Sequence, residues 1–186
     1  MITLYKLLFN NDNDEIECVY HTSDTHIRND AGRFKEYDSG FENFYKILGN
    51  DKRKKIVVLT GDILHEGNRP SALAFSMMRT FFRKVSEICP LIVTRGNHDC
   101  NMNNENDPNF LFEIVDEISK SGNKIYYCDY GTYRYCNILF GVTNIYSEQI
   151  YEFKDIDKKY YEDIKQKNKY IIALCHRTMP DEMIKN

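Results

Sequence analysis

Several features typical of membrane, secreted and disordered proteins are missing from this chain of 186 residues. No apolar run approaches the ~20 residues that a helix needs to cross a bilayer. The amino-terminal segment 1–17 has a short apolar patch followed by acidic residues and no small-residue cleavage site, which argues against a signal peptide. There is no internal repeat, Pro-rich linker or low-complexity tract. These absences indicate a globular protein with no membrane partner.

Paired cysteine motifs are also missing. The six cysteines include no C-x-x-C pair, which disfavours a structural zinc site and is typical of reduced thiols in an intracellular protein. The sequence does not distinguish nucleus from cytoplasm.

The composition favours one globular domain over residues 1–186. Hydrophobic residues make up 42% and charged residues 28%, which is a soluble rather than a disordered balance. The net charge of −3 does not indicate a nucleic-acid partner. It does not exclude one either, because such binding can depend on a local patch and on metals.

Apolar runs alternate with amphipathic stretches along most of the chain. The pattern predicts strands over residues 17–22, 55–60, 91–94 and 170–175, helices over 41–48, 70–88 and 108–119, and a helix-compatible polar segment over 157–169. From residue 124 to 142 two β segments follow each other, with a turn expected at Gly131-Thr132. Together these elements predict a layered α/β fold.

Each of the four predicted strands is followed by polar side chains of metal-binding type. The motifs are HTSDTH (Asp24, His26), GDILH (Asp62, His65), RGNHD (Asn97, His98, Asp99) and LCHRT (His176). Any one of them has a plain structural explanation, such as a turn residue or a surface histidine. Four such motifs at one edge of a sheet instead indicate a ligand site, and their N and O atoms suit manganese, iron or zinc.

As an ordered set, D-x-H, G-D, G-N-H-D and a later H resemble the motifs of the calcineurin-like metallophosphoesterase superfamily. HTSDTH resembles the opening motif of the SbcD nucleases, and GDILHEGNRPS resembles the second motif of the meiotic recombination 11 nucleases of the MRN repair complex. The resemblance implies a layered α/β/β/α sandwich and a site for two metal ions, Mn²⁺ first among several divalent candidates.

The resemblance also implies a role for each motif residue. Asp24 and His26 are expected to hold the first metal, Asn97 and His176 the second, and Asp62 both. His98 is the expected general acid.

The remaining polar residues near the motifs have less definite expectations. His65 is expected to orient His98 or to contact the phosphate. Asp99 either positions His98 or caps the next loop. Four arginines near the motifs are candidate phosphate contacts, although a solvated surface role is the simpler expectation for each: Arg28, Arg69, Arg95 and Arg177. His21 is expected to face the core from its strand.

The sequence departs from the family pattern in one respect. Family members continue to a G-H-x-H motif that supplies one further ligand to each metal, and then to a DNA-binding cap and an ATPase-binding segment. None of these is found in this sequence, and all five histidines lie before residue 177. The chain is therefore expected to be the amino-terminal part of a longer protein or a shortened homologue, with a sandwich incomplete at its carboxyl end.

Two classes of function remain open from the sequence. The first is a two-metal phosphodiester hydrolase of the DNA double-strand-break repair type. For that class the resemblance implies DNA as substrate, an SMC-like ATPase partner of the SbcC type, and compatibility with a homodimer. The second is a non-catalytic remnant or interaction module of the same fold. A generic calcineurin-like phosphatase or phosphodiesterase is the alternative enzyme.

Overall fold

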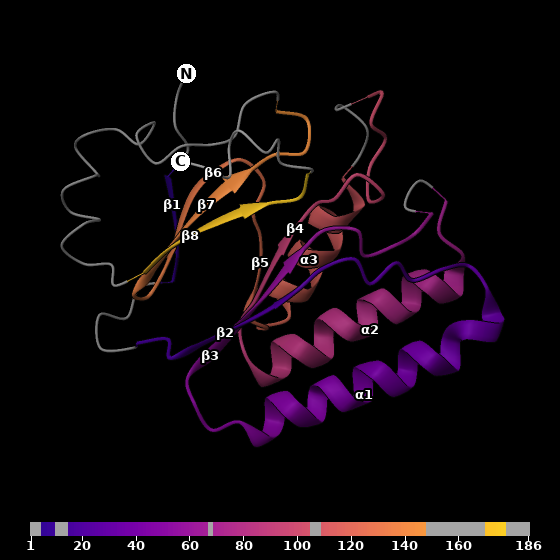
Figure 1. Ribbon diagram of the computed structural model, residues 1–186, viewed down its shortest axis with the longest axis horizontal. Coiled ribbons are helices and arrows are strands. Elements are labelled where there is room, and N and C mark those ends of the chain that lie inside the picture. The colour runs from indigo at the N-terminus through magenta and orange to yellow at the C-terminus, as the bar shows by residue number, and fades with distance from the viewer. Residues whose placement is uncertain (1–4, 10–14, 67–68, 105–108, 148–169, 178–186) are drawn as a thin grey trace.

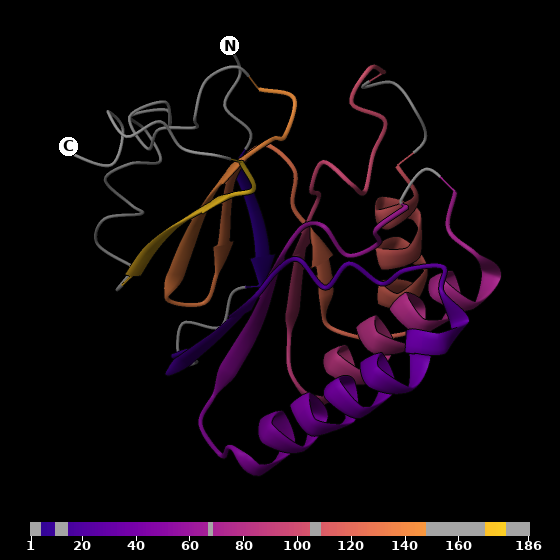
Figure 2. The same cartoon turned by 45° about the vertical axis from the view of Figure 1, so that its right-hand side comes forward.

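The fold is a layered α/β arrangement, as the sequence predicts. The computed structural model describes residues 5–9, 15–66, 69–104, 109–147 and 170–177. Within them, three α-helices cover one face of a four-stranded sheet, and a second four-stranded sheet lies against its other face (Figures 1 and 2). No helix among these residues is both long and apolar enough to span a bilayer.

The first sheet is entirely parallel. Its strands follow the order β2 (Cys18–Thr22), β3 (Lys55–Thr60), β4 (Leu91–Thr94) and β5 (Ile125–Tyr127). Almost every side chain of β3 and β4 is buried, because these central strands are covered on both faces. The loops that carry the GDILH and RGNHD motifs begin directly after the last residues of these two strands.

The helices are amphipathic and pack on the first sheet. They are α1 (Phe34–Asn50), α2 (Ala72–Ile88) and α3 (Phe110–Lys120), with a short 3₁₀ turn over Ala31–Arg33 before α1. The hydroxyl of Ser71 accepts a hydrogen bond from the Ala74 N–H and caps α2. The Asn109 side chain caps α3 in the same way. Phe81 packs against Phe41 and Phe44 of α1, and Phe82 is buried in the same core.

The second sheet is mixed and follows the order β1 (Tyr5–Phe9), β6 (Gly131–Tyr135), β7 (Ile138–Thr143) and β8 (Tyr170–Cys175). Strands β6 and β7 are antiparallel, whereas the β1–β6 and β7–β8 pairs are parallel. A second core joins the two sheets. It includes Ile56, Val58 and Ile92 from the first sheet and Tyr133, Phe140 and Leu174 from the second.

Three details differ from the sequence-based expectation. The turn expected at Gly131-Thr132 instead lies at Cys136-Asn137, between the paired residues Tyr135 and Ile138. The β1 strand was not expected, and α1 begins seven residues before its predicted start at residue 41. The predicted helical segment 157–169 lies outside the described residues. The described residues form only one of the two helical layers of the expected α/β/β/α sandwich.

Candidate metal centre

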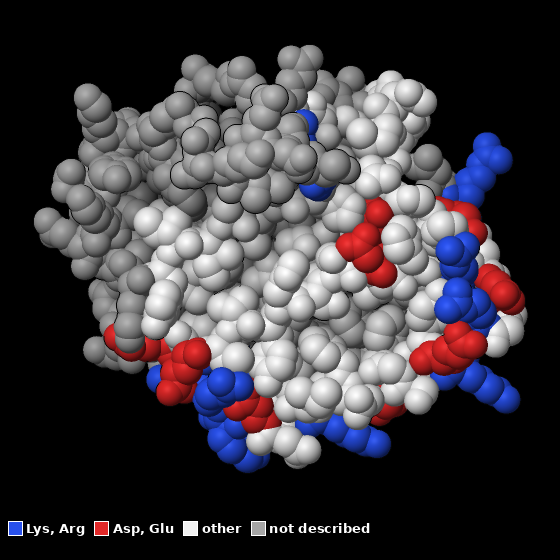
Figure 3. All heavy atoms as spheres, viewed as in Figure 1, with Lys and Arg blue, Asp and Glu red and all other residues white. Residues whose placement is uncertain are grey.

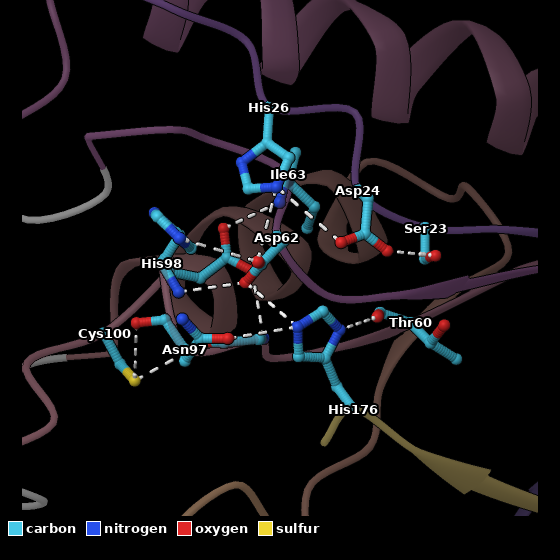
Figure 4. Close-up of polar contacts among 12 residues, drawn as sticks. Ser23, Asp24, His26, Thr60, Asp62, Ile63, Asn97, His98, Cys100 and His176 are labelled. Carbon is cyan, nitrogen blue, oxygen red and sulfur yellow. Dashed lines mark hydrogen bonds and ion pairs between the residues drawn. The ribbon is translucent and has the colours of Figure 1, made fainter. Parts of the chain in front are cut away.

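The five residues expected to bind metal converge at the carboxyl ends of the strands (Figure 4). His26 Nε2 lies 3.5 Å from Asp62 Oδ2 and 3.7 Å from Asp24 Oδ1. On the other side, His176 Nε2 lies 3.2 Å from Asp62 Oδ1 and 3.2 Å from Asn97 Oδ1. The two oxygens of Asp62 thus face two different groups of ligand atoms.

The site is formed by both sheets rather than by the edge of one. The loops after β2, β3 and β4 supply Asp24, His26, Asp62 and Asn97. His176 follows β8, which belongs to the second sheet. The expectation of a single sheet edge is therefore corrected: the site lies where the carboxyl ends of the first sheet's strands meet the carboxyl end of β8.

Three of these residues adopt a backbone conformation that is uncommon for residues other than glycine. The φ angles of Asp24, His26 and Asp62 are 56°, 43° and 52°. Hydrogen bonds between neighbouring loops hold them: Asp24 N–H donates to Gly61 O at 3.1 Å, and His26 N–H donates to Asp62 O at 3.0 Å. Left-handed conformations of this kind are found preferentially at functional sites, where the surrounding structure compensates for them.

Two glycines allow the β3 and β4 loops to approach each other at backbone distance. A Cβ atom on Gly96 would lie 2.2 Å from Asp62 Oδ1 and 2.3 Å from Asp62 N. A Cβ atom on Gly61, whose φ is +78°, would lie 2.5 Å from Gly96 Cα. The central carboxylate can therefore occupy its place only if both positions lack a side chain.

Asp99 holds the same two loops together. Its buried carboxylate accepts hydrogen bonds from Ile63 N at 2.9 Å, Leu64 N at 3.1 Å and Gly96 N at 3.0 Å. Burial raises the pKa of Asp99 to about 6, although the backbone hydrogen bonds oppose the rise. Both oxygens of Asp99 are thus directed at the loop backbone rather than at the His98 ring.

Backbone carbonyl groups fix the tautomers of two histidines. His176 Nδ1 lies 2.7 Å from Thr60 O, and His98 Nδ1 lies 2.9 Å from His65 O. Because a carbonyl oxygen only accepts, each Nδ1 carries a proton and donates it. The Nε2 atom of each ring is left facing Asp62, at 3.2 Å for His176 and 3.9 Å for His98.

The charges of these groups are coupled. The hydrogen bond with Asp62 raises the pKa of His176 to about 9, against the effect of burial. For Asp62, burial acts to raise the pKa, but the hydrogen bonds from the His176 ring and the His98 backbone outweigh it, so that the pKa is lowered. Asp62 therefore keeps its negative charge although only 5% of its side chain is exposed.

His65 contacts both neighbouring histidines. Its ring stacks on that of His98, with the centroids 5.2 Å apart and the planes at 16°. Its Nδ1 lies 3.3 Å from His26 Nδ1. Desolvation, followed by the charge of Arg28, lowers the pKa of His65 and favours the neutral ring. Its contacts with the His98 ring fit the expected role of orienting that ring.

Two expectations about neighbouring residues are wrong. His21 is exposed rather than in the core, and its Nε2 lies 2.7 Å from Thr60 Oγ1. Arg95 is buried rather than solvated. Its guanidinium lies 3.5 Å from Asp129 and 4.8 Å from the centre of the Tyr146 ring. Its Nε is the one buried side-chain N or O atom without a hydrogen-bond partner among the described residues.

Sequence reasoning missed three contributors to the site. Thr60 acts through its carbonyl group, which orients His176. Gly96 acts through the absence of a side chain. Ser23 donates its hydroxyl to Asp24. Of these three, only Gly96 could have been found from the sequence. A glycine directly before a candidate ligand, as in Gly61-Asp62 and Gly96-Asn97, suggests that two backbone segments approach closely.

The arrangement fits a pair of divalent cations. Ligand atoms of Asp24, His26 and Asp62 all lie within 4.8 Å of one another. The second group, around Asp62 Oδ1, adds an imidazole nitrogen and an amide oxygen. Carboxylate, imidazole and amide donors are the ligands preferred by manganese, zinc and iron in hydrolytic sites.

Comparison with known proteins agrees with this geometry. The model of the calcineurin-like phosphoesterase family matches residues 19–185. The chain belongs to this family. The family consists of metal-dependent hydrolases of phosphate esters, which agrees with the enzyme class expected from the sequence.

Two individual proteins are also similar to this member of the calcineurin-like family. The uncharacterized protein R555 of Acanthamoeba polyphaga mimivirus is 37% identical over 174 residues, which cover 92% of this chain and 13% of the relative. The chain therefore spans a small part of that relative's length. The crystal structure of Pseudomonas putida nuclease MPE matches 73% of this chain and 56% of its own, with a TM-score of 0.43 and 17% identity.

Proposed function

We propose that this member of the calcineurin-like phosphoesterase family hydrolyses phosphodiester bonds in DNA with two divalent cations, Mn²⁺ first among them. The observation that carries the proposal is the position of His98. Its ring is fixed by the carbonyl of His65, and its Nε2 lies 3.9 Å from Asp62 Oδ2, beside the ligand groups. An acid at this place can protonate the alkoxide that leaves a phosphodiester.

Each ligand residue has a definite place in this proposal. Asp24 and His26 would hold the first cation, Asn97 and His176 would hold the second, and Asp62 would be shared by both. When bound, the cations neutralise charge on the phosphate and acidify a water molecule for attack. The chain itself directs His176 Nε2 at Asp62 and Asn97, because Nδ1 donates its proton to Thr60 O.

The choice of a DNA repair nuclease over a generic phosphatase is supported by two motifs. HTSDTH and GDILHEGNRPS resemble those of the SbcD and meiotic recombination 11 nucleases. His65 occupies the position at which generic phosphatases more often carry an aspartate. By the same resemblance we propose an SMC-like ATPase of the SbcC type as partner and compatibility with a homodimer.

Surface charge on one face does not add to the case for DNA. Figure 3 shows Lys and Arg side chains interspersed with Asp and Glu along the edge over α1 and α2. Two exposed ion pairs link basic and acidic side chains of the helices: Arg79–Glu117 joins α2 to α3, and Lys84–Glu42 joins α2 to α1. The substrate proposal therefore depends on the site and its motifs.

The test compares leaving groups. With Mn²⁺ present, His98→Ala should lower the rate on DNA by ~10²–10⁴-fold, because an alkoxide needs a proton to leave. The loss on bis(p-nitrophenyl) phosphate should be smaller, because p-nitrophenolate leaves without protonation. His21→Ala is the matched control, since His21 is an exposed histidine outside the ligand groups and contacts the hydroxyl of Thr60 rather than the carbonyl group that orients His176.

Other outcomes would support the alternatives. Faster hydrolysis of p-nitrophenyl phosphate than of any diester would indicate a phosphatase. Two bound cations without turnover on any ester would indicate a non-catalytic module. Equal losses on both diesters in His98→Ala would show that His98 is not the acid.

A further inference from the structure

We propose that His26, His65 and His98 form a separate three-imidazole site for Zn²⁺, whose occupation excludes the first catalytic cation. Ligand nitrogens of these three side chains all lie within 4.8 Å of one another. They come from three different loops, after β2, β3 and β4. The cluster is thus built by the fold and does not follow from sequence proximity.

The spacing of two of the nitrogens matches zinc. His26 Nδ1 and His65 Nδ1 are 3.3 Å apart. Two nitrogens at ~2.0–2.1 Å from a tetrahedral zinc ion are about 3.3–3.4 Å from each other. The two nitrogen atoms therefore already lie at the separation that a shared zinc ion requires.

The third ligand is His98. Its Nδ1 donates to His65 O at 2.9 Å, so the nitrogen left for a cation is Nε2. The centroids of the His26 and His98 rings are 4.8 Å apart and the ring planes are at 88°. Both side chains are partly open to solvent, at 29% and 38% exposure. An ion from solution can reach them, and water can supply a fourth ligand, as in catalytic zinc sites with three histidines.

The cluster competes with the first catalytic cation through His26. His26 Nε2 faces Asp24 and Asp62, whereas His26 Nδ1 faces His65. A neutral imidazole carries a proton on one nitrogen and offers a lone pair on the other. Zinc on Nδ1 therefore places the proton on Nε2, where it points at the carboxylates and blocks the first cation.

The effect of zinc on activity rests on the proposed function, because zinc would take His26 from the first cation and bind the nitrogen of His98 that donates the proton. Zinc should act as an inhibitor of the Mn²⁺-dependent reaction. The binding itself does not depend on any activity of the chain. Its test therefore uses the free protein and Zn²⁺ alone.

The decisive measurement is the nitrogen to which zinc binds. Long-range ¹H–¹⁵N spectra of the histidine rings should show zinc at Nδ1 of His26 and His65 and at Nε2 of His98. Zinc at Nε2 of His26, with His65 unchanged, would overturn the proposal, since that is the ligand set of the first catalytic cation. Unchanged spectra would overturn it too and would leave the His26–His65 contact as a plain hydrogen bond.

Variants separate the three-imidazole site from the catalytic pair. His65→Ala should weaken the tightest zinc binding at least tenfold, and His65→Asn should do the same if the alanine variant folds poorly. Asn97→Ala should leave this zinc site intact, because Asn97 belongs to the second cation. Undiminished zinc affinity in both His65 variants would refute the proposal, whether or not the protein proves to be a nuclease.

Discussion

At the residue scale, the site depends on a carboxylate in a conformation that few residues accept. Asp62 has a φ of 52° and is almost completely buried, yet its two oxygens face separate ligand groups. Asn and Asp tolerate the left-handed region better than other non-glycine residues. An amide can therefore replace Asp62 without breaking the backbone, which separates ligand chemistry from folding.

Asp62→Asn should lose the binding of both cations and, without cations, lower the thermal midpoint by what the contact between Asp62 and His176 contributes. Asp99→Asn should lose less manganese affinity but lower the free energy of unfolding by about 1–3 kcal/mol, because an NH₂ group would face backbone donors in place of a buried acceptor. Calorimetric titration with Mn²⁺ and thermal unfolding of both variants provide the measurement. Equal losses of manganese affinity would show that Asp62 is not the shared ligand.

Gly96 offers a second test at this scale. Gly96→Ala should lower the free energy of unfolding by at least ~1–3 kcal/mol, because its Cβ would lie 2.2 Å from Asp62 Oδ1. Gly40→Ala is the matched control: nothing lies within 4 Å of a Cβ atom there, in the middle of α1. This control should gain about 0.5–1 kcal/mol. Similar denaturant midpoints for the two variants would contradict the close approach of the β3 and β4 loops.

At the scale of elements, the sequence predicted the bounds of a strand correctly where an apolar run was clearly delimited. The strands β3, β4 and β8 have the predicted bounds, because each is an apolar run that ends in a ligand motif. The β6–β7 turn was misplaced, since Cys136 adopts a φ of 49° in the turn and cysteine carries no turn signal. Phe34 and Tyr37 extend the apolar face of Phe41 at helical spacing, but the start of α1 was missed because the run Asp38-Ser39-Gly40 is typical of a loop.

The loops that follow these elements are joined by a polar network around Arg95. Its guanidinium contacts Asp129 and the Tyr146 ring, and Asn144 donates to Asp129 Oδ1 at 2.6 Å. Burial raises the pKa of Asp129, and the charge of Arg95 opposes the rise. The network connects the end of β4, which leads to Asn97, with the loops after β5 and β7.

Arg95→Met should lower the free energy of unfolding by about 1–3 kcal/mol, because Asp129 loses its charged partner while it remains half-buried. Adding Asp129→Asn should recover part of this loss, so that the two changes are not additive. Urea unfolding of the two single variants and the double variant measures the coupling. Strict additivity would show that the contact between the two side chains contributes nothing.

At the scale of the whole molecule, the site joins the two sheets. The sequence predicted which residues would converge, because each follows a strand, but not that β8 belongs to another sheet than β2, β3 and β4. Sheet membership depends on long-range pairing: β5 joins the first sheet, whereas β6, four residues later, pairs with β1 in the second. A pattern of local hydrophobicity does not contain that information.

Because Asn97 follows the first sheet and His176 follows the second, a cation bound by both should hold the sheets together. Cations that bind only the folded chain stabilise it by about 2.7 kcal/mol at a concentration of 100 times Kd. For a chain of this size, that corresponds to a rise in Tm of about 5–10 °C. Differential scanning fluorimetry with and without Mn²⁺ measures the rise.

The variants for this measurement follow from the geometry. His176→Ala should lose a large part of the rise, because the second cation then has no ligand from the second sheet, whereas His21→Ala should keep all of it. Hydrogen exchange should show that Mn²⁺ slows the amides of β8, which is an outer strand of its sheet among the described residues. Asn97→Ala should abolish this protection. An undiminished rise in His176→Ala, with β8 exchange unaffected by Mn²⁺, would mean that the cations bind to the first sheet alone.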